Sequence, residues 1–204
     1  MSEYRITNLA DLEALYGAAN PVALKKETKY LTPQYRRLVE VAPFFALASV
    51  GEGGLDCSPR GDPAGFVTVL DDVTLAIPDR RGNNRIDTLR NIIADPRVAL
   101  LFLIPGVGET LRINGSAEIS TDPTLITRFT HDGKPPKTVL IVHIAAVYFQ
   151  CAKAIIRSKL WDPATQVARQ SLPSTGELVQ SAVADFDSKD YDKGAPERLR
   201  QTLY

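Results

Sequence analysis

The chain has 204 residues, of which 44% are hydrophobic, and its 24 acidic residues balance 24 basic ones. This length suits a single domain, and the missing basic excess argues against nucleic-acid binding as the main function. Because the sequence has neither the apolar core of a secretory signal nor an apolar run of ~18 residues, we expect a cytoplasmic protein without nucleic-acid or membrane partners.

Two amphipathic helices are predicted in the N-terminal segment, residues 1–40. The first begins after Asn8, which can cap it, and ends at Gly17. The second begins after Thr32, with Pro33 at the first helical position, where a missing N–H costs nothing.

The segment 41–150 reads as short strands joined by tight turns. Strands are predicted in "FFALASV", "RVALLFLI", "ETLRINGSAEIS" and "KTVLIVHIAAVYF", and "GFVTVLDDVTLAIP" indicates a hairpin closing at Asp71 and Asp72. Five or six strands with few helices between them favour an antiparallel barrel over a parallel α/β sheet. The predicted fold class is therefore mainly β with flanking helices.

Three helices and a polar arm complete the prediction. The first follows the hairpin and runs through Ala94, with Ile86, Leu89 and Ile93 on one face. The others are a short helix in "TDPTLITRF" and one in "CAKAIIRSKLW". From Pro163 onward the pattern is polar and weak, so residues 151–204 are predicted to be a helix followed by an arm.

The stretch "DRRGNNRIDTLRNI" places three arginines and two asparagines around one glycine, just before a helix. An asparagine, Asn83 or Asn84, can cap this helix, and the helix N-terminus carries N–H donors and partial positive charge. Arginines at 80, 81 and 85 add full charges and bidentate donors. Together they would hold a phosphate; the alternative is a solvated hairpin exit with a capping asparagine.

A second polar cluster, "DCSPRGDPAGFV", precedes the hairpin and contains Ser58, Arg60 and Asp62. If the hairpin folds back, this cluster and the arginine loop come close together at one end of the barrel. The alternative is a polar turn, because Pro, Gly and Asp are turn formers.

The cysteines and histidines indicate no metal site. Cys57 and Cys151 are far apart without a Cys-x-x-Cys motif, so a reduced pair is favoured over a disulfide. His143 lies in an apolar run and is predicted to be a core residue, and His131 precedes a turn. Neither histidine has the spacing of a zinc ligand.

Residues 40–163, including "DPRVALLF" and the basic loop before a helix, together resemble the pyridoxamine 5'-phosphate oxidase-like family of FMN-binding split barrels. "CAKAIIRSKLWDP" resembles a bacterial subgroup of that family. The resemblance implies a split β-barrel and a homodimer with FMN at the subunit interface.

The resemblance also assigns residues. It implies that Arg85, beside the two asparagines, supplies a cation to the FMN phosphate, and that Ile77 and Pro78 lie along the flavin. Ser58 stands where the family oxidase has an arginine, and Arg60 can compensate for it. A set of further candidates completes the predicted cofactor site. The full set is Ser58, Arg60, Gly61, Asp62, Ile77, Pro78, Asp79, Arg80, Asn83, Asn84, Arg85, Thr110, Lys153 and Arg157, with no metal ligand.

Two pairs within this set have specific interpretations. Asp62 and Asp79 are possible proton carriers, or solvated turn carboxylates. Lys153 and Arg157 lie four residues apart on one helical face, so they form a solvent face or reach the flavin or substrate of a partner subunit.

The C-terminus departs from the family oxidase, which closes with a tryptophan and an Arg-x-His segment that bind its vitamin B6 substrate; this chain ends "APERLRQTLY". The resemblance therefore implies a flavin but not pyridoxamine-phosphate oxidation. The predicted function is an FMN-dependent oxidoreductase that transfers hydride or electrons to or from a small molecule. The alternatives are a non-catalytic FMN-binding module, such as a carrier or sensor, and an interaction protein that has lost the ligand.

Overall fold

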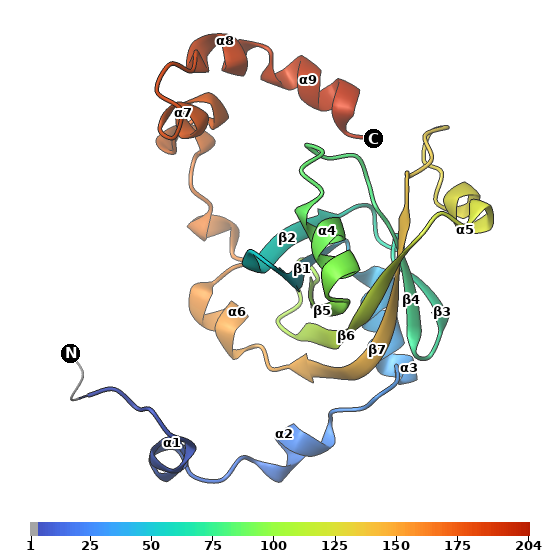
Figure 1. Ribbon diagram of the computed structural model, residues 1–204. Helices are drawn as coiled ribbons and strands as arrows, with labels where there is room; N and C mark the ends of the chain where they lie inside the picture. The colour runs from blue at the N-terminus through green and yellow to red at the C-terminus, as the bar shows by residue number, and fades with distance from the viewer. Residues whose placement is uncertain (1–3) are drawn as a thin grey trace.

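The computed structural model describes residues 4–204 (Figure 1). Residues 1–3 of the predicted N-terminal segment lie outside the described residues. One sheet dominates the fold, with the strand order β2-β1-β5-β6-β7-β4-β3. Its strands are β1 (Phe44–Gly51), β2 (Gly54–Gly61), β3 (Thr68–Asp71), β4 (Thr74–Pro78), β5 (Arg97–Leu103), β6 (Thr110–Ser120) and β7 (Val139–Gln150).

Helices precede the strands in the sequence, lie between some of them and follow the last one. They are α1 (Leu9–Tyr16), α2 (Pro21–Lys25), α3 (Pro33–Val41), α4 (Asp87–Ala94), α5 (Pro123–Arg128), α6 (Lys153–Ser158), α7 (Thr175–Gln180), α8 (Ser188–Lys193) and α9 (Ala195–Thr202). Two short 3₁₀ turns, η1 (Pro163–Thr165) and η2 (Arg169–Ser171), connect α6 to α7. No helix in residues 4–204 has the length and apolar character needed to cross a membrane.

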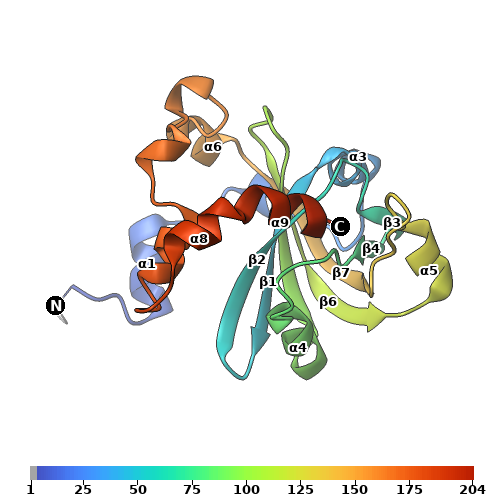
Figure 2. The ribbon, with the colours of Figure 1, turned by 90° about the horizontal axis from the view of Figure 1, so that it is seen from above.

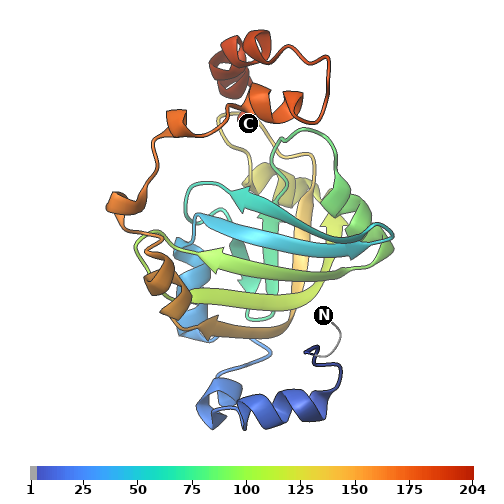
Figure 3. The same ribbon diagram turned by 90° about the vertical axis from the view of Figure 1, so that its left-hand side faces the viewer.

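The sheet curves into a barrel that does not close (Figure 3). Every strand pair is antiparallel, and the edge strands β2 and β3 do not pair with each other. The long strands β6 and β7 join the two walls, with a register shift between Asn114 and Gly115. A Cβ on Gly115 would lie 2.0 Å from the His143 carbonyl oxygen, so only glycine fits there. The prediction of an antiparallel split barrel is confirmed.

The barrel interior is filled by alternating residues of its strands. β1 buries Phe45 and Leu47, which follow the period of two that the sequence indicates. Phe45 packs on Phe102 of β5, with ring centroids 4.9 Å apart. Helix α3 contributes the fully buried Val39, and its predicted start is confirmed, with Thr32 as the cap.

The structure decides one alternative and corrects one prediction near the site. The alternative of a polar turn at "CSPRG" is wrong, because this stretch belongs to β2, which pairs with β1 along its whole length. Pro59 is tolerated there because β2 is an edge strand. Helix α4 begins at Asp87 and buries Thr88 and Ile92, whereas Ile86 and Ile93 are exposed. The predicted apolar face was wrong at Ile86, which lies before the helix, and at Ile93, whereas Leu89 packs against the core as predicted.

Further corrections concern the polar segments. His143 is not a core residue, since it points outward from β7 and lies 3.5 Å from Glu118. The segment after Pro163, predicted as an arm with weak polar patterning, contains the helices α7, α8 and α9. Its clearest signal in the sequence is the capping box of Ser174 and Glu177 at the start of α7. Counting β2, the sheet has one strand more than the upper prediction of six.

Candidate functional site

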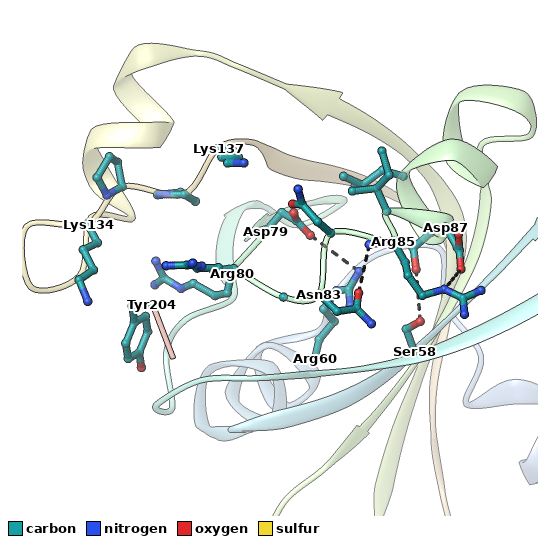
Figure 4. A pocket seen from close by; sticks show the side chains of 18 of the residues that line it. Ser58, Arg60, Asp79, Arg80, Asn83, Arg85, Asp87, Lys134, Lys137 and Tyr204 are labelled. Carbon is teal, nitrogen blue, oxygen red and sulfur yellow. Dashed lines mark hydrogen bonds and ion pairs between the residues drawn. The ribbon is translucent and has the colours of Figure 1, made fainter. Parts of the chain in front are cut away.

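A cavity of about 970 Å³ opens at the end of the barrel where β2 and β4 finish (Figure 4). Three segments far apart in the sequence form its walls: the end of β2, the arginine loop that enters α4, and the loop 134–137 before β7. The end of the C-terminal helix α9 forms a further wall. The predicted approach of the β2 cluster to the arginine loop is confirmed.

Backbone pairing explains why these segments meet. β4 pairs with β7 so that Pro78 lies opposite Val139. One residue further on, the Asp79 N–H donates to the Thr138 carbonyl at 3.0 Å. The sheet thereby delivers the arginine loop and the loop 134–137 to the same edge. Helix α4 returns the chain against β1, the neighbour of β2.

Arg60 and Asp79 face each other inside the cavity. The Arg60 Nη2 lies 3.8 Å from Asp79 Oδ1, and both side chains are about one-fifth exposed. The Arg60 Nε is buried and makes no hydrogen bond to the described residues. Burial raises the pKa of Asp79, and the nearby Arg60 charge only partly opposes this effect. The pair therefore offers one donor without a partner and one carboxyl that holds a proton more readily than usual.

Arg80 and Asp62, two predicted site residues, are already engaged with each other. Arg80 Nε donates to Asp62 Oδ2 at 2.6 Å, and Arg80 Nη1 donates to the Phe129 carbonyl at 2.7 Å. The Asp62 side chain is only 2% exposed, and its other oxygen accepts a hydrogen bond from the Tyr204 hydroxyl at 2.6 Å. Asp62 is thus a structural acceptor, and only Asp79 keeps the character of a proton carrier.

The N-terminus of α4 faces the cavity without a side-chain cap. Its N-cap residue is Ile86, in the left-handed conformation with φ of 53°, and no side chain accepts from its first N–H groups. Asn84 also has a positive φ of 64°. A β-branched residue in this conformation is strained, and strain of this kind concentrates at functional sites. The uncapped N–H groups of Asp87, Thr88 and Leu89 are available to an anion.

Two side chains adjust the charge around this helix end. Arg85 Nε donates to Asp87 Oδ2 at 2.8 Å, which neutralises the carboxylate nearest the helix N-terminus. The Arg85 side chain is 76% exposed, and its Nη groups make no hydrogen bond to the described residues. Asn83 Oδ1 accepts from the Arg85 N–H at 3.1 Å. Asn83 therefore organises the loop and does not cap the helix as predicted.

Three buried or half-buried oxygens lie beneath the same helix end. The buried Thr88 hydroxyl donates to Asp56 Oδ2 at 3.1 Å, and the Ser58 hydroxyl donates to the same oxygen at 3.1 Å. The two hydroxyl oxygens are 3.4 Å apart. Ser58 was predicted from the sequence, whereas Asp56 and Thr88 were not. Asp56 could have been predicted together with Ser58, because residues 56 and 58 lie on the same face of a strand.

The remaining predicted residues lie outside this cavity. Gly61 and Pro78 line a second cavity of about 290 Å³, and the Ile77 side chain is buried in the barrel core. Thr110 pairs with Gln150 at the other end of β7, close to helix α6 with Lys153 and Arg157. These three residues form a separate group within one chain. The cavity lining also includes three residues that the sequence reasoning did not select: Lys134, Lys137 and Tyr204.

The cavity has an excess of positive charge. Six basic and three acidic side chains line it. Each acid except Asp56 faces an arginine, so the unpaired charge in the cavity is basic. Such a site attracts a small anion. Among residues 4–204, no group of three or more histidine, cysteine or acidic residues is arranged to hold a metal ion.

The fold and the cavity define a class: a split antiparallel barrel with a cavity of excess positive charge at one end. More specifically, the chain belongs to the pyridoxamine 5'-phosphate oxidase family, whose sequence model matches residues 31–151, more than half of its length. The match begins just before α3 and ends just before α6, so it covers the whole sheet. Membership of this family indicates a flavin-binding, oxidoreductase type of function.

Solved structures similar to the chain include HupZ from Group A Streptococcus, with 19% identity over 57% of this chain and 91% of that one, at a TM-score of 0.47. An F420 reductase matches with 21% identity over 57% and 98%, at a TM-score of 0.45. A protein related to general stress protein 26 from Clostridium acetobutylicum, of the pyridoxinephosphate oxidase family, matches with 15% identity over 58% and 86%, at a TM-score of 0.44. No curated protein matches the chain.

Proposed function

We propose that the cavity binds FMN and that the chain is an FMN-dependent oxidoreductase acting on a small molecule. The observation that carries this proposal is the uncapped N-terminus of α4, which faces a cavity with excess positive charge. Helix N–H groups and the helix dipole favour an anion of phosphate size at this position. FMN differs from riboflavin by one phosphate, so the site distinguishes the two flavins.

The residues present fit a flavin phosphate. The buried Arg60 Nε needs a partner, and an unsatisfied buried donor is costly. The free Nη groups of Arg85 supply a second charged donor at the mouth. Arg60 thus replaces, as a phosphate-binding residue, the arginine that the family oxidase carries at the position of Ser58. Ser58 and Thr88 contribute indirectly, because their hydroxyls fix Asp56 below the helix end.

Bound FMN would supply hydride or electron transfer, and the protein would orient it and supply protons. Asp79 is the residue suited to hold a proton at its carboxyl oxygen. Its pKa is raised by burial, and it lies in the cavity opposite Arg60. A carboxyl with a raised pKa exchanges protons closer to neutral pH than an exposed aspartate does.

The proposal includes a homodimer in which a partner completes the site. Thr110, Lys153 and Arg157 lie on elements away from the cavity of their own chain. Lys153 and Arg157 make no ion pair among the described residues, so their charges are available to a ligand of a second copy. Light scattering should show a dimer. Lys153→Glu should weaken FMN binding, and the variant should remain a dimer.

The proposed FMN site is tested by comparing FMN with riboflavin. Arg85→Ala should weaken FMN binding about tenfold, the low end of a charge-assisted hydrogen bond, because the side chain is exposed. Riboflavin affinity should not change, because riboflavin lacks the phosphate. Arg90→Ala is the matched control: Arg90 is an exposed arginine of helix α4, just after the arginine loop, and it does not line the cavity. Equal affinity of the unmodified protein for FMN and riboflavin would refute the assignment.

A second measurement separates an enzyme from a binding module. The FMN-loaded protein should be reduced by a nicotinamide or other small donor and reoxidised through repeated cycles. Asp79→Asn should slow turnover, because asparagine has no carboxyl group to hold the proton. It should keep FMN affinity, because the contacts proposed for the phosphate remain. A flavin that stays oxidised with every donor of a broad panel would support the carrier or sensor alternative.

A further inference from the structure

Tyr204 stands between two cavities. The large cavity and the second one, of about 290 Å³, share five lining residues: Arg60, Arg80, Arg81, Gly82 and Tyr204. Four of the five come from β2 and the arginine loop. Tyr204 alone comes from the C-terminal helical segment (residues 174–204), which passes over this end of the barrel (Figure 2).

Three contacts hold the Tyr204 side chain in this position. Its hydroxyl donates to the buried carboxylate of Asp62 at 2.6 Å. Its ring stacks on His131, with the ring centroids 4.1 Å apart and an angle of 26° between the planes. The Arg80 guanidinium lies 5.5 Å from the ring centroid. The tyrosine thus ties the C-terminal segment to Asp62, just after β2, and to His131, in the loop between α5 and β7.

Little else holds this segment to the barrel. None of its apolar side chains is fully buried, and its leucines at 178, 199 and 203 are all more than half exposed. Within the segment, α8 packs on α7 and α9, and the stretch that links it to α6 consists of short 3₁₀ turns. Releasing Tyr204 therefore requires the loss of a few polar and aromatic contacts, not of a hydrophobic core.

We propose that Tyr204 is a movable partition that limits the cavity to a flavin mononucleotide and excludes a dinucleotide such as FAD. This inference rests on the proposed FMN site. The second cavity adjoins the arginine loop through Arg81 and Gly82. In this proposal, a group attached to the FMN phosphate would extend toward the second cavity, and Tyr204 seated on Asp62 would block it. Displacement of Tyr204 would join the two cavities, which already share lining residues.

The partition is tested by the ratio of FMN to FAD affinity, measured from the quenching of flavin fluorescence. The unmodified protein should prefer FMN, and Tyr204→Ala should reduce that preference at least tenfold. Tyr204→Phe keeps the ring and removes the hydroxyl, so its ratio of FMN to FAD affinity should lie between those of the unmodified protein and Tyr204→Ala. Tyr191→Phe is the control, because the Tyr191 hydroxyl of α8 makes no hydrogen bond to the described residues. An unchanged ratio in Tyr204→Ala would overturn the partition.

A readout without flavin distinguishes failure of the partition from failure of the FMN site. In the apo protein, the amides of residues 195–204 should exchange hydrogen at least tenfold faster in Tyr204→Ala, and the barrel strands should be unaffected. Trypsin should also cut sooner after Arg198 and Arg200. Unchanged exchange would overturn the claim that Tyr204 holds the segment. Faster exchange with no binding of either flavin would refute the FMN site and the size selection that rests on it.

Discussion

Asp62→Ala should destabilise the apo protein far more than the loss of a surface ion pair of the same length. The Asp62 carboxylate is 2% exposed and accepts two bonds of 2.6 Å, from Arg80 and Tyr204. Removing one partner of a buried pair costs about 3–5 kcal/mol, because the other charge stays unpaired. Arg80 is 19% exposed and keeps the Phe129 carbonyl, so the lower figure of about 3 kcal/mol applies.

Thermal unfolding of the apo protein measures this cost. For a chain of this size, 1 kcal/mol shifts the Tm by about 2–4 °C, so Asp62→Ala should lower it by about 6–12 °C. Glu197→Ala is the control, since Glu197 also pairs with an arginine at 2.6 Å but both side chains are more than half exposed. Its Tm should change by less than about 2 °C. The Tm shift of Asp62→Asn should lie between those of Asp62→Ala and Glu197→Ala. Equal shifts for Asp62→Ala and Glu197→Ala would refute the structural role of the buried carboxylate.

Two further predictions concern the cavity wall. Asp79→Asn should raise the Tm at neutral pH: burial raises the Asp79 pKa, so its stabilising contribution exists at low pH and is lost as the carboxyl ionises. This gain in Tm should vanish as the pH falls below the usual pKa range of an aspartate. A gain in Tm that does not depend on pH would contradict the role of the Asp79 carboxylate. Ile86→Gly should stabilise by about 0.5–1 kcal/mol by relieving the left-handed strain, whereas Ile93→Gly in the same helix should destabilise by a similar amount. Urea unfolding checks the signs, and a loss at both positions would show that Ile86 is unstrained.

The sequence predicted the sheet well because alternation reports directly on burial. β1 and β5 bury every second residue, and β6 does so up to the register shift between Asn114 and Gly115. β2 was missed as a strand because its apolar content is low. As an edge strand it has few buried side chains, and its pairing with β1 depends on the backbone. Turn-forming residues such as Pro59 and Gly61 are compatible with that position.

The site was predicted only in part, because residue types do not show which charges are already paired. Arg80, Arg81 and Arg85 look alike in the sequence. In the structure, Arg80 is bound to Asp62, a residue 18 positions away, and Arg85 is bound to its near neighbour Asp87. Tyr204 had no local signal at all, since its partner Asp62 lies 142 positions away. Contacts of this separation are fixed by the tertiary structure alone.

Because its arginines have different partners, successive parts of the arginine loop have different roles. Arg80 anchors the start of the loop to β2 and the turn after α5, so that the loop leaves the barrel in one direction. The loop then reaches α4 through the left-handed Ile86, which leaves the first N–H groups of the helix uncapped. A capping asparagine at position 86 would satisfy those donors with its own side chain and compete with a phosphate for them. The strained, uncapped entry into α4 therefore leaves this helix end open to the proposed phosphate, and Arg80 and Asp62 would support that site by holding the loop in place.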